Sequence, residues 1–274
     1  MRLLLIGCTG LVGRGLIPLL QAAGHQLTLV SRRSSPAALP PEVAKSLQWI
    51  QADPAAASSW APSMPLHDAL AASDGVVNLA GEPIAEQRWS VQHLEKLEAS
   101  RLCTTSHLVS AMATLAEPPS VLVNASAVGY FGTSLDERFE ESSPAGDDFL
   151  ARLCQKWEQA AAQKPSATRL VVLRIGIVLS SEGGALAKML PVFRAGFGGP
   201  IGSGQQWMSW IERGDLCRII QSSLESESWS GVVNAVAPDP VTMAVFAGSL
   251  GRCLGRPSLL PVPGPMLQLL LSDG

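Results

Sequence analysis

The chain has 274 residues, of which 47% are hydrophobic and 16% charged, so it can bury a sizeable core and general disorder is excluded. Its formal net charge of −3 excludes the strongly basic surface that binds nucleic acid. The N-terminal stretch is too short and too glycine-rich for a secretory leader, and no window is long enough to span a bilayer. We therefore expect a cytoplasmic protein that binds neither nucleic acid nor membrane.

Nearly continuous apolar runs predict strands that are covered on both faces. They span 2–7, 26–31, 47–51, 75–81, 120–126 and 169–178. Amphipathic segments between the runs predict helices over 13–24, 90–116 and 147–163. Strands that alternate with helices in this way predict an α/β fold with a doubly wound parallel sheet.

The alternation of predicted strands and helices ends at about Ser180. The stretch 183–210 predicts a helix followed by a long glycine-rich loop. Further helices are expected over 213–226 and 242–255, and a strand near 231–237 would complete the sheet. We divide the chain into a dinucleotide-binding domain, 1–179, and a small C-terminal lobe for substrate, 180–274.

A glycine-rich motif, GCTGLVG, lies between the first predicted strand and the first predicted helix. In this context Gly7 allows a tight turn, Gly10 lets the backbone approach a pyrophosphate, and Gly13 lets the helix pack on the strand. The helix N-terminus offers unpaired N–H groups to the anion. The cofactor-binding residues predicted here are Gly7, Thr9, Gly10, Leu11, Val12 and Gly13. The alternative is a glycine-rich turn without a ligand.

The second strand ends in Ser31, Arg32 and Arg33, where an NAD site usually has an acidic residue for the ribose 2′-hydroxyl. A guanidinium pairs with a 2′-phosphate, so these residues predict NADP as the cofactor. The alternative is two solvated arginines. Asp53, after the third strand, is either an adenine contact or ordinary turn chemistry before proline.

The motifs GCTGLVG, VNLAGEPI and SAVGYFG occur in this order, and with them the chain resembles the extended or atypical short-chain dehydrogenase/reductases. More narrowly, it is similar to epimerase-like proteins of the NAD-dependent epimerase/dehydratase type, often labelled cell-division-inhibitor-like. The segments that carry the match are 78–89, 100–101, 125–132, 146–158, 173–180, 183–211 and 231–242. The resemblance implies a Rossmann fold, NADP binding and an oxidoreductase- or epimerase-like site, and it names no substrate.

The resemblance also implies roles for single residues. The residues implied to contact the cofactor are Leu79, Ala80, Gly81, Arg101 and Val178. The residues implied to face the substrate are Glu82, Arg88, Trp89, Ser126, Tyr130 and Gly202 of the loop 199–204. For Trp89, ordinary packing is an open alternative. Relatives usually continue beyond the end of this chain, so we expect a C-terminal truncation or an oligomer contact at 266–271, and a homodimer stays open.

Tyr130 is the single tyrosine, and Tyr130 and Ser126 are our candidate catalytic residues. In the wider superfamily a lysine four residues after a tyrosine makes that phenol a usable acid or base. No Tyr-x-x-x-Lys pair occurs in this chain, and Phe149 and Leu153 stand near its usual places. We therefore favour pocket lining and hydrogen bonding over proton transfer for Tyr130. The helical register of Lys156 is wrong for a substitute.

A second departure lies in WIERGDL, where Glu212 stands in place of a histidine that relatives tend to have. Asp215 is expected to cap the helix that follows. The four histidines show no metal-ligand spacing, so we predict no metal site.

These features together predict an NADP-dependent oxidoreductase or epimerase that acts on a small hydroxyl or carbonyl compound. The alternative, which the missing Tyr/Lys pair favours, is a non-catalytic NADP-binding regulator, for instance in cell or plastid division. A nucleotide-sugar epimerase ranks below both, because its reaction depends on the same missing pair.

Overall fold

The structure, a computed structural model, describes residues 1–34, 39, 41–84 and 87–258. Seven parallel strands form the main sheet in the order β10-β6-β5-β4-β1-β2-β3. Their bounds are β1 (Arg2–Ile6), β2 (Gln26–Ser31), β3 (Gln48–Gln51), β4 (Gly75–Asn78), β5 (Val121–Ala127), β6 (Arg169–Ile175) and β10 (Gly231–Ala235). The chain moves outward from β1 to β3 and then returns to β4 on the other side of β1. The predicted doubly wound sheet is therefore confirmed, and its order reverses beside β1, where such folds bind ligands.

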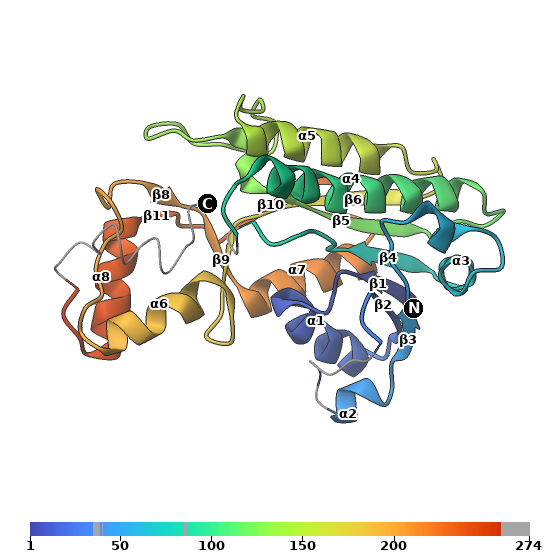
Figure 1. The fold of residues 1–274 in the computed structure, drawn as a ribbon, viewed down its shortest axis with the longest axis horizontal. Coiled ribbons are helices and arrows are strands. Elements are labelled where there is room, and N and C mark those ends of the chain that lie inside the picture. The colour runs from blue at the N-terminus through green and yellow to red at the C-terminus, as the bar shows by residue number, and fades with distance from the viewer. Residues whose placement is uncertain (35–38, 40, 85–86, 259–274) are drawn as a thin grey trace.

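Helices cover both faces of this sheet (Figure 1). One face carries α3 (Pro65–Ala71), α4 (Val91–Ala113) and α5 (Phe149–Ala162), and the other carries α1 (Leu11–Ala22) and α7 (Arg213–Glu225). The short elements α2 (Pro41–Ala44), η1 (Ala57–Trp60) and η2 (Val128–Phe131) lie in the connections. This layering explains why the strands read as continuous apolar runs.

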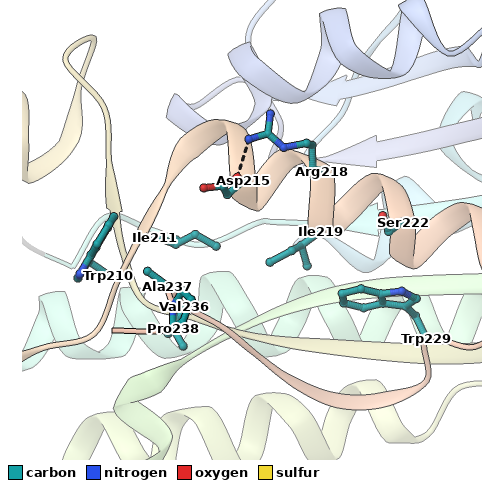
Figure 2. A pocket seen from close by; sticks show the side chains of 10 residues that line it. All are labelled: Trp210, Ile211, Asp215, Arg218, Ile219, Ser222, Trp229, Val236, Ala237 and Pro238. Carbon is teal, nitrogen blue, oxygen red and sulfur yellow. Dashed lines mark hydrogen bonds and ion pairs between the residues drawn. The ribbon is translucent and has the colours of Figure 1, made fainter. Parts of the chain in front are cut away.

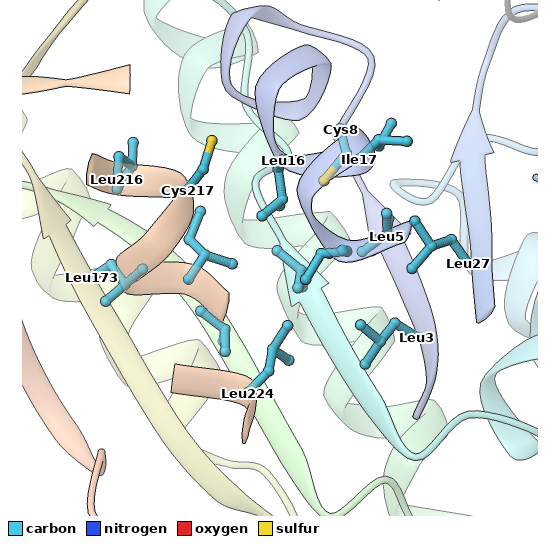
Figure 3. Packing of buried hydrophobic residues seen from close by; sticks show 14 of the residues in the cluster. Leu3, Leu5, Cys8, Leu16, Ile17, Leu27, Leu173, Leu216, Cys217 and Leu224 are labelled. Carbon is cyan, nitrogen blue, oxygen red and sulfur yellow. The ribbon is translucent and has the colours of Figure 1, made fainter. Parts of the chain in front are cut away.

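The larger core lies between the sheet and the helices α1 and α7 (Figure 3). The helix α1 buries Leu16, Ile17 and Leu20 at helical spacing against Leu3 and Leu5 of β1. Each such side chain contributes about 1.5–3 kcal/mol on full burial. The first helix is thereby fixed on the first strand, and this sets the position of the loop between them.

The C-terminal part contains α6 (Gly184–Arg194) and α8 (Met243–Leu254), with the two-stranded pairs β8 (Trp207–Met208) with β11 (Val241–Thr242) and β7 (Ile177–Leu179) with β9 (Trp210–Glu212). Its small core is formed by Met189, Phe193, Met208, Met243 and Ala247. The predicted domain boundary at 179–180 stays a prediction, and the run 266–271 lies outside the described residues. Among the described helices, none is long and apolar enough to cross a membrane.

Three local predictions need correction. The run 169–178 is not one strand, because the chain leaves the main sheet at Gly176. A Cβ at Gly176 would lie 2.7 Å from the carbonyl oxygen of Ser209, so only glycine allows this crossing. The glycine-rich stretch before residue 213 contains the strands β8 and β9. The cap of α7 is Glu212, whose carboxylate accepts from the N–H groups of Gly214 and Asp215, while Asp215 pairs with Arg218.

Candidate functional site

The loop between β1 and α1 depends on two glycines for its own packing. Gly7 has a φ of +75°, and a Cβ there would lie 2.4 Å from the amide nitrogen of Ala80. A Cβ at Gly13 would lie 1.8 Å from the carbonyl oxygen of Cys8. These two positions are glycine because the backbone of the protein itself approaches them.

Gly10 is different, because a Cβ there would meet nothing within 4 Å. It is the N-cap residue of α1, and no described side chain caps that N-terminus. The N-terminus of the helix therefore has no side-chain cap, and the space beside Gly10 is open. This arrangement fits a bound pyrophosphate, which needs both the donors and the close backbone approach.

The end of β2 lies beside the segment that follows β4. Arg32, whose side chain is 71% exposed, has its guanidinium 3.9 Å from the carboxylate of Glu82. Ser31 is buried, and its hydroxyl accepts from the N–H of Arg33. Asp53 accepts from the N–H of Ala55. This contact agrees with a turn role for Asp53, the second of the two roles considered above. The geometry thus groups Glu82 with the predicted cofactor residues.

Arg101 of α4 contacts the segment 79–82. Its guanidinium donates to the carbonyl oxygens of Leu97 and Glu82 and lies 5.3 Å from the ring centre of Trp157. A Cβ at Gly81 would lie 2.9 Å from the Cζ atom of Arg101, so a side chain there would displace the guanidinium. Burial is the main cause that lowers the pKa of Arg101. The side chain of Arg101 therefore supports the predicted cofactor segment by binding the backbone of that segment.

The segment around Val178 reaches the same helix N-terminus from the C-terminal part. Leu79 and Val178 pack against the core that also contacts Val12. A Cβ at Gly183 or Gly184 would lie 3.1 Å from the side chain of Leu11. The predicted cofactor residues after β4, in β7 and in α1 are therefore close to one another in space.

Tyr130 and Ser126 belong to one side-chain network. The Cζ atom of Arg174 lies 3.3 Å from the ring centre of Tyr130. The Nε and Nη2 atoms of Arg174 each donate to one carboxylate oxygen of Glu158, both at 2.9 Å. The hydroxyl of Ser126 donates to the same carboxylate at 2.6 Å. A cation is thus present beside the phenol, although not the lysine of the wider superfamily.

The network is largely buried, and the phenol oxygen of Tyr130 is the polar atom in it that is available to a ligand. Ser126 and Arg174 are each 3% exposed. The thiol of Cys154, whose pKa burial raises, interacts with Ser126 from the preceding turn of α5. Tyr130 is half-buried, and its oxygen has no hydrogen-bond partner among the described residues. It can therefore donate to an oxygen of a ligand.

The loop that follows Tyr130 is attached to the same network. The Nη1 atom of Arg174 donates to the carbonyl oxygen of Glu141, and the carboxylate of Glu141 accepts from the N–H of Asn234 in β10. The ring of Phe139 stacks on Phe131 at 5.1 Å. Trp207 of β8 donates to the carbonyl oxygen of Leu135. The loop thus connects the C-terminal part to Tyr130.

The helix that should carry a Tyr/Lys pair has apolar residues instead. Leu153 is buried, and Phe149 contacts the ring of Trp89 edge-on at 5.9 Å. Lys156 pairs with Glu98 of α4 at 2.6 Å and its side chain is 55% exposed. The register expected for Lys156 from the sequence agrees with this position, away from Ser126.

The remaining substrate residues are less closely connected. The indole of Trp89 donates to the carbonyl oxygen of Ile84, and the carbonyl of Arg88 accepts from the N–H of Ser90. Gly202 has a φ of +58° in the exposed loop before β8. Among the described residues Gly202 makes no hydrogen bond or ring contact with Tyr130, so its role stays a prediction.

A cavity of about 480 Å³ lies elsewhere, beside α7 and the segment that follows β10. Figure 2 shows Trp210 and Trp229 at its opposite ends and the Asp215–Arg218 pair on its helix side. None of the predicted cofactor or catalytic residues lines it. Within the described part of the chain, no cluster of His, Cys, Asp and Glu is suited to a metal ion.

Arg174 and Glu158 are the site residues that the sequence interpretation did not identify. The available signal was an arginine inside the apolar run of β6, since a charge in such a strand must find a partner. The sequence did not show that the partner is Glu158 on α5.

The geometry can be compared with known proteins. A model of the NAD dependent epimerase/dehydratase family matches residues 3–235. The human epimerase family protein SDR39U1 is 41% identical over 271 residues, which cover 98% of this chain and 85% of the human one. Its chloroplastic homolog from Arabidopsis thaliana is 40% identical over 270 residues, which cover 98% of this chain and 75% of the plant one.

Structure comparison agrees. The crystal structure of human SDR39U1, isoform 2, with NADPH has a TM-score of 0.82 and 40% identity, and the match covers 99% of this chain and 86% of that one. The resemblance inferred from the motifs is confirmed. The chain belongs to the NAD dependent epimerase/dehydratase family.

Proposed function

We propose that this protein binds NADP(H) and acts as an oxidoreductase on a small substrate that carries a hydroxyl or carbonyl group. The observation that carries the cofactor proposal is the open space at Gly10, in front of an uncapped helix N-terminus. Arg32 is exposed at the end of β2, where it can pair with a 2′-phosphate. The human relative crystallised with NADPH supports the same choice.

The substrate part of the proposal depends on the phenol of Tyr130. Bound NADPH would supply a hydride to a carbonyl carbon. The O–H of Tyr130 would hold the carbonyl oxygen, because it lies past the carboxyl end of β5 and has no partner among the described residues. Trp89, in the segment before α4, and Phe149, at the start of α5, would enclose the substrate.

Calorimetric titration with NADPH and NADH tests the cofactor. We expect NADPH to bind at least ~10-fold more tightly, as one charge-assisted contact implies. Equal affinity, or no heat with either, would remove the basis of the proposal.

Oxidation of NADPH against a panel of aldehydes and ketones tests the reaction. We expect Tyr130→Phe to lower kcat about 10-fold or more without a change in the Kd for NADPH. The variant removes only the phenol oxygen, so its unchanged cofactor affinity is the internal control.

The second candidate is a non-catalytic NADP-binding regulator. Burial of the apolar Leu153 near the place of the missing lysine favours it. Tight NADPH binding without turnover of any carbonyl in the panel, together with capture of a partner protein by the NADPH-loaded form, would establish this candidate instead.

A further inference from the structure

Arg174 is connected to both predicted catalytic residues. It contacts Tyr130 directly, and it shares the carboxylate of Glu158 with Ser126. Its guanidinium lies on the ring of Tyr130, and its Nε and Nη2 atoms hold the carboxylate to which Ser126 donates. The side chain of Glu158 is only 13% exposed, so water does not compete strongly for these contacts.

The three nitrogens of Arg174 are all engaged. The Nε and Nη2 atoms bind Glu158, and the Nη1 atom binds the carbonyl oxygen of Glu141. A planar group held at three points has one orientation, so the aromatic ring that lies on it is also fixed. The ring of Phe131 contacts the same guanidinium at 4.9 Å and meets Tyr130 edge-on. The plane of the phenol ring is therefore set by Arg174 together with Phe131.

Glu158 sets Ser126 in the same way. Because the hydroxyl proton of Ser126 is donated to the carboxylate, the oxygen of Ser126 can only accept from other groups. The network thus fixes a donor at Tyr130 and an acceptor at Ser126.

We propose that Arg174 and Glu158 are positioning residues that orient Tyr130 and Ser126 together for the substrate, in place of the missing Tyr/Lys pair. This rests on the proposed oxidoreductase function. The proposal differs from a purely structural ion pair in one respect: loss of the pair must act through Tyr130 and Ser126.

A double-mutant cycle tests this. In the NADPH-oxidation assay, Arg174→Lys keeps the charge but loses the planar contact, and we expect it to lower kcat roughly 10-fold without a change in the Kd for NADPH. Because the arginine acts through the phenol and the Ser126 hydroxyl, Arg174→Lys should cost less than 2-fold more in a background that already carries Tyr130→Phe and Ser126→Ala. Independent, additive losses in the cycle would overturn the proposal.

Arg169 provides the matched control. It lies on the same strand, and its guanidinium is likewise held, by the carbonyl oxygens of Ser223, Leu224 and Trp229. Arg169→Lys should leave kcat unchanged. An equal fall in kcat for Arg169→Lys would show that the effect of Arg174 is only structural. Should Arg174→Lys not fold, Glu158→Gln replaces it in the cycle, because an amide cannot hold both guanidinium nitrogens as a carboxylate does.

A second readout does not depend on turnover. Tyr130 is the single tyrosine, so ¹³C-tyrosine labelling gives one set of ring signals in NMR spectra. We expect Arg174→Lys and Glu158→Gln to shift these signals and Arg169→Lys to leave them in place. Unshifted signals in both network variants would overturn the proposal. Shifted signals together with no turnover of any carbonyl would leave the positioning intact and refute the oxidoreductase function.

Discussion

The candidate site has two halves: the glycine-rich loop 7–13 and the side-chain network of Ser126, Tyr130, Glu158 and Arg174. The amino-acid sequence determines these two halves in different ways. The loop needs seven consecutive residues, 7–13, and the close approach of Ala80, and each requirement concerns backbone. The network needs side chains from β5, η2, α5 and β6, and its contacts join residues far apart in the chain. Backbone requirements can be recognised in the sequence as a short motif. A side-chain network can be recognised only in the folded structure, because its members are far apart in the chain.

The comparison predicts that substitutions within the loop separate cleanly into folding and binding effects. The largest effect is expected for Gly13→Ala, because the new Cβ would overlap the carbonyl oxygen of Cys8 and backbone must shift. We expect a loss of about 3 kcal/mol in the free energy of unfolding, measured by urea denaturation.

Gly10→Ala is its matched control. It meets no atom of the protein, so we expect a change in stability of no more than about 0.5 kcal/mol. Its Cβ would occupy the space proposed for the pyrophosphate, so NADPH should bind about 10-fold more weakly. A Gly10→Ala protein with full NADPH affinity would break the proposed use of that space.

An effect on cofactor binding alone is expected at the end of β2. Arg32→Ala should weaken NADPH binding by about 1.5–3 kcal/mol, the contribution of a hydrogen bond to a charged group, and leave NADH nearly unchanged. Arg33→Ala, made in parallel, shows which of the two arginines holds the 2′-phosphate. Equal losses for both cofactors would mean that Arg32 does not recognise that phosphate.

The loop on the network side should respond more weakly. Phe139→Leu keeps an apolar side chain but removes the stacking on Phe131, which contributes about 0.5–1.5 kcal/mol. We expect this loss in the free energy of unfolding, a raised KM for the substrate, and an unchanged Kd for NADPH. A change in NADPH affinity would contradict the separation of the two halves.

The smallest effect serves as a reference far from both halves. Asp74, at the start of β4, accepts from the guanidinium and the N–H of Arg2, and these bonds hold the pKa of its carboxyl below its ordinary value. The unfolded chain therefore binds this proton more readily, so the stabilisation is present at neutral pH and is lost as the pH falls below about 4.

Because the Asp74 pair is largely exposed, Asp74→Asn should cost only about 0.5–1 kcal/mol at pH 7. The difference from the unsubstituted protein should shrink in acid, measured by urea denaturation at pH 7 and pH 3. A constant difference between the two pH values would show that the ion pair is not its cause.

Sequence alone predicted the fold and the loop because both depend on repeated local rules. The apolar runs identified the strands, and the spacing of Gly7, Gly10 and Gly13 identified the turn. The break at Gly176 was missed, because a glycine inside an apolar run does not reveal which backbone will cross it. Glu212 was missed as a cap, because the helix begins one residue after it and Asp215 offered the same chemistry. Arg174 and Glu158 were missed because their pairing is set by how α5 packs on the sheet.

The two contacts of Glu141 have a consequence for association between molecules. Among the described strands β10 is the last in the sheet, and an outermost strand offers free backbone groups to which a strand of another molecule can add. The carboxylate of Glu141 already occupies the N–H of Asn234 on that strand, so the sheet is closed to growth at this point. A dimer built by extending the sheet there would have to displace the side chain of Glu141, and the backbone carbonyl of Glu141 accepts from the same Arg174 that lies on the ring of Tyr130.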